Sequence, residues 1–148
     1  MTTVLIVESN PPAYAQEAFL FQTALAWIDP GTEMRVACPH ETLLTPEMLD
    51  GADGVIFTGS SVDWGVDTPE GAPLWAAMEM VFAGGLPTYG SCNGMQLAAC
   101  VLGGATAASP NGRERGLARG VTLTEVGLAH PFLAGRRQGY GVPCIHSH

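Results

Sequence analysis

The sequence predicts a doubly wound α/β fold, in which helices cover both faces of a mostly parallel sheet. Two observations carry this prediction. The strand-like runs are apolar throughout rather than alternating, which is typical of strands buried on both faces, and segments with helical periodicity separate them. The chain has 148 residues, of which 47% are hydrophobic and 14% charged, so it is long enough to bury a core. We therefore expect a single domain over residues 1–148.

The first half of the chain supplies two strands and two helices. Residues 2–7 form a short apolar run rich in β-branched side chains, and a polar, proline-containing stretch follows it. From residue 13 to residue 28, apolar side chains recur at steps of four and three, which predicts a helix with a broad buried side. Residues 34–38 form a second strand. Thr45 and Pro46 are typical of the N-cap and first residue of a helix.

The next segment repeats the pattern twice before it changes. Residues 54–58 and 86–89 are apolar runs that predict a third and a fourth strand, and residues 73–82 and 93–102 predict the helices that follow them. Glycine pairs end both helices. Beyond the second pair, residues 121–124 alternate and no long helix follows, so we expect antiparallel strands or an excursion from the sheet there.

Net charge and the N-terminus exclude several classes of function. Fourteen acidic and six basic residues give a net charge of -8, the wrong sign for non-specific binding to nucleic-acid phosphates. There is no lysine, so lysine Schiff-base and phosphate-loop chemistry are excluded. The N-terminal apolar run is too short for a signal peptide or a membrane span, which predicts a cytoplasmic protein. The four cysteines form no Cys-x-x-Cys pair, and we expect neither a metal nor another cofactor.

A Gly-x-Cys-x-Gly motif places a cysteine in the turn between the fourth strand and the next helix. In such a turn the central residue adopts a strained backbone conformation, and glycines two positions before and after it allow close packing. Gly90 and Gly94 flank Cys92 in this way. The carboxyl edge of the sheet is where open α/β sheets bind ligands, and the helix N-terminus is expected to lower the thiol pKa. The motif therefore predicts Cys92 as a nucleophile.

An acyl-transfer nucleophile needs N–H donors that point at the developing oxyanion. The turn itself supplies one, the backbone N–H of Asn93. The turn after the third strand contains Gly59 and Ser60 and ends at the same edge of the sheet. We therefore expect a second donor from this turn.

Taken together, these residues resemble the class I glutamine amidotransferase family, and most closely its stand-alone members similar to the amidotransferase part of GMP synthase. The strong match is Tyr-Gly-Ser-Cys-Asn-Gly-Met-Gln-Leu at residues 89–97, with the glycine pair at 103–104. Weaker matches follow the family's order at residues 53–60, 114–116, 121–124 and 130–135. Ser60 replaces the usual second glycine of the oxyanion loop.

The resemblance implies the same α/β fold and a glutamine-hydrolysing activity. It implies that Cys92 attacks the side-chain amide of glutamine, that ammonia leaves, and that water hydrolyses the γ-glutamyl thioester. Gln96 and the amides of Ser60 and Asn93 are then contacts to glutamine. Ammonia that is transferred rather than released needs a synthase or acceptor protein on a separate chain.

The sequence departs from the family at the catalytic base. The family's histidine and its orienting glutamate lie in a His-Pro-Glu-like segment, which residues 1–148 do not contain. The resemblance places His148 in an earlier strand, ahead of the triad, so we expect the given chain to end before its base. His146 and His148 as metal ligands lack a third ligand of clear spacing.

Two other functions remain open. A different cysteine hydrolase on the same fold, such as a γ-glutamyl peptidase or a PfpI-type intracellular protease, also fits the motif around Cys92, although Gln96 and the glycine pair favour an amidotransferase. A non-catalytic binding module that keeps the turn as a scaffold is the third interpretation.

Overall fold

The computed structural model describes residues 1–110 and 112–146, which divide into two compact units. The first unit spans residues 1–106 and the second residues 107–148. Each unit has its own sheet. The single domain expected over residues 1–148 stays a prediction.

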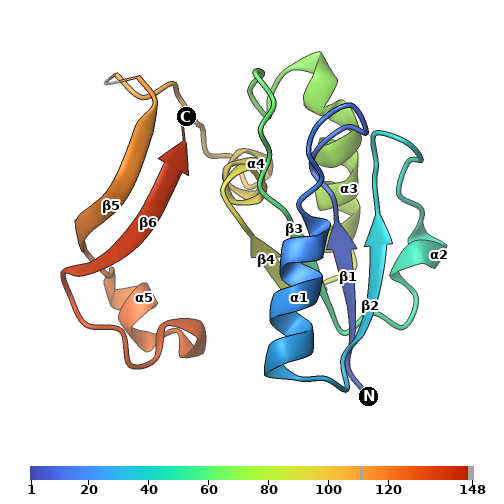
Figure 1. The fold of residues 1–148 in the computed structure, drawn as a ribbon, viewed down its shortest axis with the longest axis horizontal. Helices are drawn as coiled ribbons and strands as arrows, with labels where there is room; N and C mark the ends of the chain where they lie inside the picture. The colour runs from blue at the N-terminus through green and yellow to red at the C-terminus, as the bar shows by residue number, and fades with distance from the viewer. Residues whose placement is uncertain (111, 147–148) are drawn as a thin grey trace. The chain divides into compact units, whose positions relative to one another are not determined.

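Four parallel strands in the order β2-β1-β3-β4 form the sheet of the first unit (Figure 1). The strands are Thr3–Val7 (β1), Glu33–Ala37 (β2), Gly54–Phe57 (β3) and Thr88–Gly90 (β4). The predicted α/β fold is confirmed. Because β2 lies on one side of β1 and β3 on the other, the strand order reverses between β1 and β3. Open sheets bind ligands at such a switch point, beyond the carboxyl ends of the strands.

Helices flank this sheet and enclose its core. They are Ala18–Ile28 (α1), Pro46–Leu49 (α2), Ala72–Ala83 (α3) and Asn93–Val101 (α4), and a 3₁₀ turn, Pro69–Gly71, precedes α3. Alternate residues of β1 and β3 pack with α3 and α4 in one cluster that includes Val7, Phe57, Met78 and Leu97. Helix α1 contacts β1 and lies over the other face (Figure 1).

Helix α1 is shorter and less buried than expected. It begins at Ala18 rather than at residue 13, because the Glu8 carboxylate accepts hydrogen bonds from the N–H groups of Glu17 and Ala18 and so fixes the first turn there. Ala18 is its one buried residue, and Trp27 is 88% exposed. The prediction of a broad buried side is therefore wrong for this unit.

The second unit is built on an antiparallel pair, β5 (Glu114–Val121) and β6 (Tyr140–His146). Antiparallel strands were expected after the second glycine pair, and this part of the prediction is confirmed. Residues 121–124, however, form no strand of their own. The Thr124 hydroxyl accepts a hydrogen bond from the Gly127 N–H (3.1 Å) and caps α5 (Glu125–Ala129), which a 3₁₀ turn at Pro131–Leu133 follows.

Candidate active site

The turn between β4 and α4 holds Cys92 in a strained conformation. Its backbone has φ 45° and ψ -102°, and no other non-glycine residue in the described part of the chain has a positive φ. Backbone strain of this kind costs about 1–3 kcal/mol and clusters at functional sites. The strained strand-to-helix turn that the motif predicts is therefore present.

Both glycines of the motif are required by close packing. A Cβ on Gly90 would lie 2.6 Å from the carbonyl carbon of Gly94, and a Cβ on Gly94 would lie 2.7 Å from both the Cβ and the carbonyl oxygen of Phe57. The N–H of Ser91 donates to that same oxygen (3.0 Å). The first turn of α4 is thus pressed against β3, and Cys92 is fixed at the sheet edge.

The pKa of the Cys92 thiol is raised, and the expectation of a lowered value is wrong. Burial is the largest cause, and the negative charge of Glu17 adds to it. The N–H of Asn93 hydrogen-bonds the sulfur and lowers the pKa, but this single bond does not offset the desolvation of a half-buried thiolate.

Glu17 is a neighbour of Cys92 that the sequence did not reveal. A Cβ on Gly59 would lie 2.7 Å from Oε2 of Glu17 and 3.6 Å from Cβ of Cys92, so both side chains border Gly59. Burial, and then the charge of Glu8, raise the pKa of Glu17. In the sequence, Glu17 fell within the helix predicted from residue 13, where an acid is usually solvated.

The structure brings Asn93 and Gly59 next to Cys92. Asn93 reaches the sulfur through its N–H, and Gly59 borders the Cys92 side chain. The Ser60 hydroxyl donates to Oδ1 of Asn10 (3.0 Å), and the oxyanion role of the Ser60 amide stays a prediction. Gln96 is half-buried and lies in the first turn of α4, where its N–H donates to the carbonyl oxygen of Cys92 (3.0 Å). The roles of these residues in binding glutamine stay predictions.

A buried polar cluster beneath the oxyanion loop was also missed. Glu8, Ser9, Asn10 and Thr58 are each no more than 1% exposed. They follow β1 and β3, on the two sides of the switch point. The signal for it in the sequence is an acidic residue, Glu8, directly after a buried strand.

His40 is the one histidine of the unit that holds Cys92, residues 1–106, and follows β2, the edge strand opposite β4. Burial lowers its pKa. His148 lies outside the described residues. The described residues hold no group of three His, Cys, Asp or Glu side chains suited to a metal ion.

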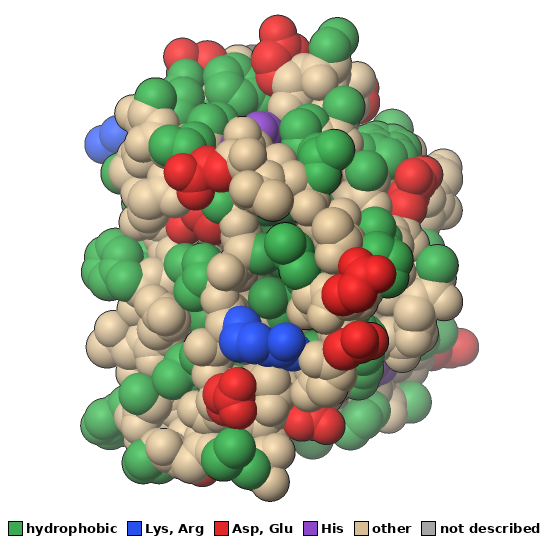
Figure 2. Space-filling view, turned by 90° about the vertical axis from the view of Figure 1, so that its right-hand side faces the viewer, with side chains coloured by type: hydrophobic (Ala, Val, Ile, Leu, Met, Phe, Trp, Pro, Cys, Tyr) green, Lys and Arg blue, Asp and Glu red, His purple; other side chains and the backbone are tan. Residues whose placement is uncertain are grey.

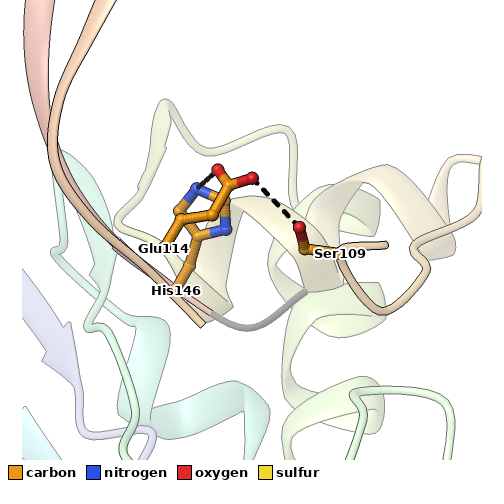
Figure 3. Close-up of polar contacts among 3 residues, drawn as sticks. All are labelled: Ser109, Glu114 and His146. Atoms are coloured by element: carbon orange, nitrogen blue, oxygen red, sulfur yellow. Dashed lines mark hydrogen bonds and ion pairs between the residues drawn. The ribbon is translucent and has the colours of Figure 1, made fainter. Parts of the chain in front are cut away.

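The second unit contains a serine, a carboxylate and a histidine in contact (Figure 3). Ser109 Oγ donates to one oxygen of Glu114 (3.0 Å), and Nε2 of His146 lies 3.5 Å from the other. Glu114 therefore stands between the other two. Glu114 and His146 lie on the two paired strands, so this cluster joins β5 to β6.

A cavity of about 350 Å³ lies at the β2 edge of the first unit. It is lined by Leu5, Arg35, Val36, Ala37, Cys38, Glu41, Thr42 and Met48. Figure 2 shows this side of the molecule, where acidic side chains lie scattered among hydrophobic ones. Cys92 follows β4 at the other edge of the sheet and does not line this cavity.

No helix of the described chain is both long and apolar enough to cross a bilayer.

Comparison with known proteins gives relatives of two kinds. The chain is 34% identical over 102 residues to a γ-glutamyl-L-1-hydroxyisopropylamide hydrolase from a Pseudomonas species, a match of 67% of this chain and 35% of the hydrolase. It is 40% identical over 96 residues to the glutamine-hydrolysing GMP synthase of Xanthomonas oryzae pv. oryzae, which covers 65% of this chain and 16% of the synthase. No family model matches.

Solved structures share the fold. A glutamine amidotransferase from Thermotoga maritima superposes with a TM-score of 0.73 at 16% identity, over 99% of this chain and 60% of its own. A glutamine amidotransferase from Methylobacillus flagellatus gives 0.66 at 21% identity, over 99% and 55%. The chain therefore spans less than two thirds of each of these proteins.

Proposed function

Because the chain belongs to the class I glutamine amidotransferase-like family, we propose that it hydrolyses the side-chain amide of glutamine through a γ-glutamyl thioester on Cys92. The observation that carries the proposal is the conformation of Cys92. Its φ of 45° at the start of α4 sets a thiol at the carboxyl edge of the sheet, and the Asn93 N–H reaches its sulfur.

The proposed reaction has two steps. The thiol gives up its proton as the sulfur attacks the amide carbon, and the carbonyl oxygen becomes an oxyanion that Asn93 and the Gly59–Ser60 loop stabilise. Collapse of this intermediate expels ammonia, which leaves with the proton. Water then attacks the thioester, which releases glutamate and restores the thiol. One well-placed oxyanion donor accelerates such a step by about 10²–10³.

The raised pKa of Cys92 makes the thiolate a minor species at neutral pH. A base must therefore remove the thiol proton before or during attack. The family resemblance assigns this task to a histidine held by a glutamate.

Hydrolysis of a larger γ-glutamyl amide is the second candidate. The relative that matches 67% of the chain is named as a hydrolase of such an amide, and its reaction would use the same nucleophile and oxyanion donors with an alkylamine in place of ammonia. Delivery of ammonia to a separate synthase or acceptor chain belongs to the first candidate.

The cytoplasmic location and the lack of nucleic-acid binding stay predictions.

The two candidates are tested with glutamine and with a γ-glutamyl N-alkylamide. Glutamate release is measured for both substrates, and intact mass detects a γ-glutamyl group on the quenched protein. We expect the adduct on the wild type and on Cys100→Ala, which replaces a half-buried cysteine of α4, and none on Cys92→Ala. Equal adduct on Cys92→Ala refutes the assignment of the nucleophile. The ratio of kcat/KM values decides between the two substrates.

A further inference from the structure

We propose that Glu8 is a positioning residue of this active site, whose buried carboxylate holds the oxyanion loop, residues 58–61, in place against Cys92. The inference rests on the proposed function. Glu8 follows β1, and the loop follows β3, so the carboxylate lies in the crevice where the strand order reverses.

Hydrogen-bond donors surround both oxygens of Glu8. Oε1 accepts from the backbone N–H of Asn10 (3.0 Å), from its side-chain Nδ2 (3.1 Å) and from the Thr58 hydroxyl (3.2 Å). Oε2 accepts from the N–H groups of Glu17 (2.6 Å) and Ala18 (2.7 Å). Four of these five donors are N–H groups, which can only donate, so both oxygens of Glu8 act as acceptors.

Two paths lead from this carboxylate to the oxyanion loop. Thr58 is the first residue of the loop, and its hydroxyl proton can bond either Glu8 or the carbonyl oxygen of Gly59 (2.9 Å). Asn10 donates to Glu8, and its Oδ1 accepts from the Ser60 hydroxyl (3.0 Å) and from the Ser61 N–H (2.9 Å). Each end of the loop is thus tied to the same buried charge.

A third path leads to the neighbour of the nucleophile. The bonds from Oε2 fix the backbone of Glu17 at the N-terminus of α1, and the Glu17 carboxylate borders Gly59 together with Cys92. The single side chain of Glu8 therefore sets the distance between the loop, the start of α1 and the Cys92 site.

An amide cannot replace this carboxylate. In Glu8→Gln one oxygen becomes an NH₂ group, which then faces two N–H groups or the donors of Asn10 and Thr58. An N–H or O–H group that faces this NH₂ group has no acceptor, and a buried donor without an acceptor destabilises the folded protein. The loop must shift to find other acceptors, and the oxyanion donors shift with it.

Two electrophiles distinguish a positioning role of Glu8 from a merely structural one. The γ-p-nitrophenyl ester of glutamate acylates Cys92 through an oxyanion, and its leaving group needs no proton. Iodoacetamide alkylates the same thiol by direct displacement, without an oxyanion. Removal of an oxyanion donor costs about 10²–10³ in rate, and a displaced donor costs part of this. In Glu8→Gln we therefore expect the acylation rate to fall at least tenfold and the alkylation rate to change less than threefold.

Matched variants keep the test valid if Glu8→Gln folds poorly. Asn10→Ala cuts the path to Ser60 and Ser61 and leaves the α1 cap intact, so it should lower acylation in the same way. Asp53→Asn is the control, because Asp53 bonds the Thr3 N–H (2.8 Å) between the same two strands at their amino ends, and it should leave both rates unchanged.

Amide hydrogen exchange tests whether Glu8 holds the loop without any reaction at Cys92. The Ser61 N–H should exchange faster in Glu8→Gln and Asn10→Ala than in Asp53→Asn. Equal acylation of Glu8→Gln, Asn10→Ala and wild type, with unchanged exchange in residues 58–61, overturns the role of Glu8. A wild type that is alkylated but never acylated refutes the proposed function instead, and the exchange data then still decide whether Glu8 holds the loop.

Discussion

Gly94 tests whether the packing of α4 on β3 fixes the nucleophile. A Cβ at this position would lie 2.7 Å from both Cβ and the carbonyl oxygen of Phe57, well inside the optimum of about 3.5–4.0 Å for carbon contacts. Overpacking costs about 1–3 kcal/mol. Because both clashing atoms belong to the main chain or are fixed to it, we expect a cost near 3 kcal/mol for Gly94→Ala. Alanine returns about 1 kcal/mol in a helix, which leaves a net loss of about 2 kcal/mol.

Urea unfolding followed by tryptophan fluorescence measures this loss. All three tryptophans lie in the first unit, so the signal reports the sheet that carries Cys92. A loss of about 2 kcal/mol lowers the urea midpoint by about 1 M. Gly84→Ala is the control, because Gly84 ends α3 with helical backbone angles and a Cβ there would make only ordinary van der Waals contacts, the nearest at 3.4 Å, so alanine should stabilise slightly. If Gly94→Ala is as stable as Gly84→Ala, the packing argument fails.

Three further predictions concern the acid beside the nucleophile and the second unit. Glu17→Gln should lower the pKa of Cys92, because it removes a negative charge that raises this pKa. Alkylation of Cys92 by iodoacetamide near neutral pH should therefore be faster. Glu33 is exposed at the start of β2, so the control Glu33→Gln should leave the pH dependence of the alkylation rate unchanged. Gly59→Ala should displace the flexible Glu17 carboxylate rather than the main chain, so the free energy of unfolding should change by less than about 1 kcal/mol. Because the Glu17 charge raises the pKa of Cys92, its displacement should accelerate alkylation of Cys92, and slower alkylation contradicts this prediction. Thr124→Ala removes the N-cap of α5 and should lower the free energy of unfolding by about 1 kcal/mol. We expect this loss in unfolding followed by circular dichroism and no change in unfolding followed by tryptophan fluorescence. A shift in both unfolding curves contradicts an effect confined to the second unit.

The sequence predicted those features that depend on neighbours along the chain. The four strands of the first sheet needed only their apolar runs, and the turn at Cys92 needed only two glycines at the right spacing. In the structure these glycines have the expected cause, since neither Gly90 nor Gly94 has room for a Cβ.

Features that depend on distant residues were missed or wrong. Helix α1 starts late because the carboxylate of Glu8, nine residues before Glu17, holds its first N–H groups, and no periodicity reveals such a bond. The pKa of Cys92 rises because burial and Glu17 act on it, and both are consequences of the folded chain. The motif placed the Asn93 N–H beside the sulfur, and its hydrogen bond does lower the pKa of Cys92, but the local sequence pattern could not weigh this bond against desolvation.

At residue 92 the backbone conformation favours glycine for stability, whereas the reactive thiol requires cysteine. A φ of 45° is easy for glycine and strained for every other residue, so Cys92→Gly relieves about 1–3 kcal/mol of strain and removes the thiol in the same step. A library of this chain selected only for resistance to heat would therefore enrich variants that have lost the Cys92 thiol. Engineering of this protein must score the reactivity of this thiol together with folding, because selection for stability favours glycine at residue 92 and selection for thiol reactivity favours cysteine.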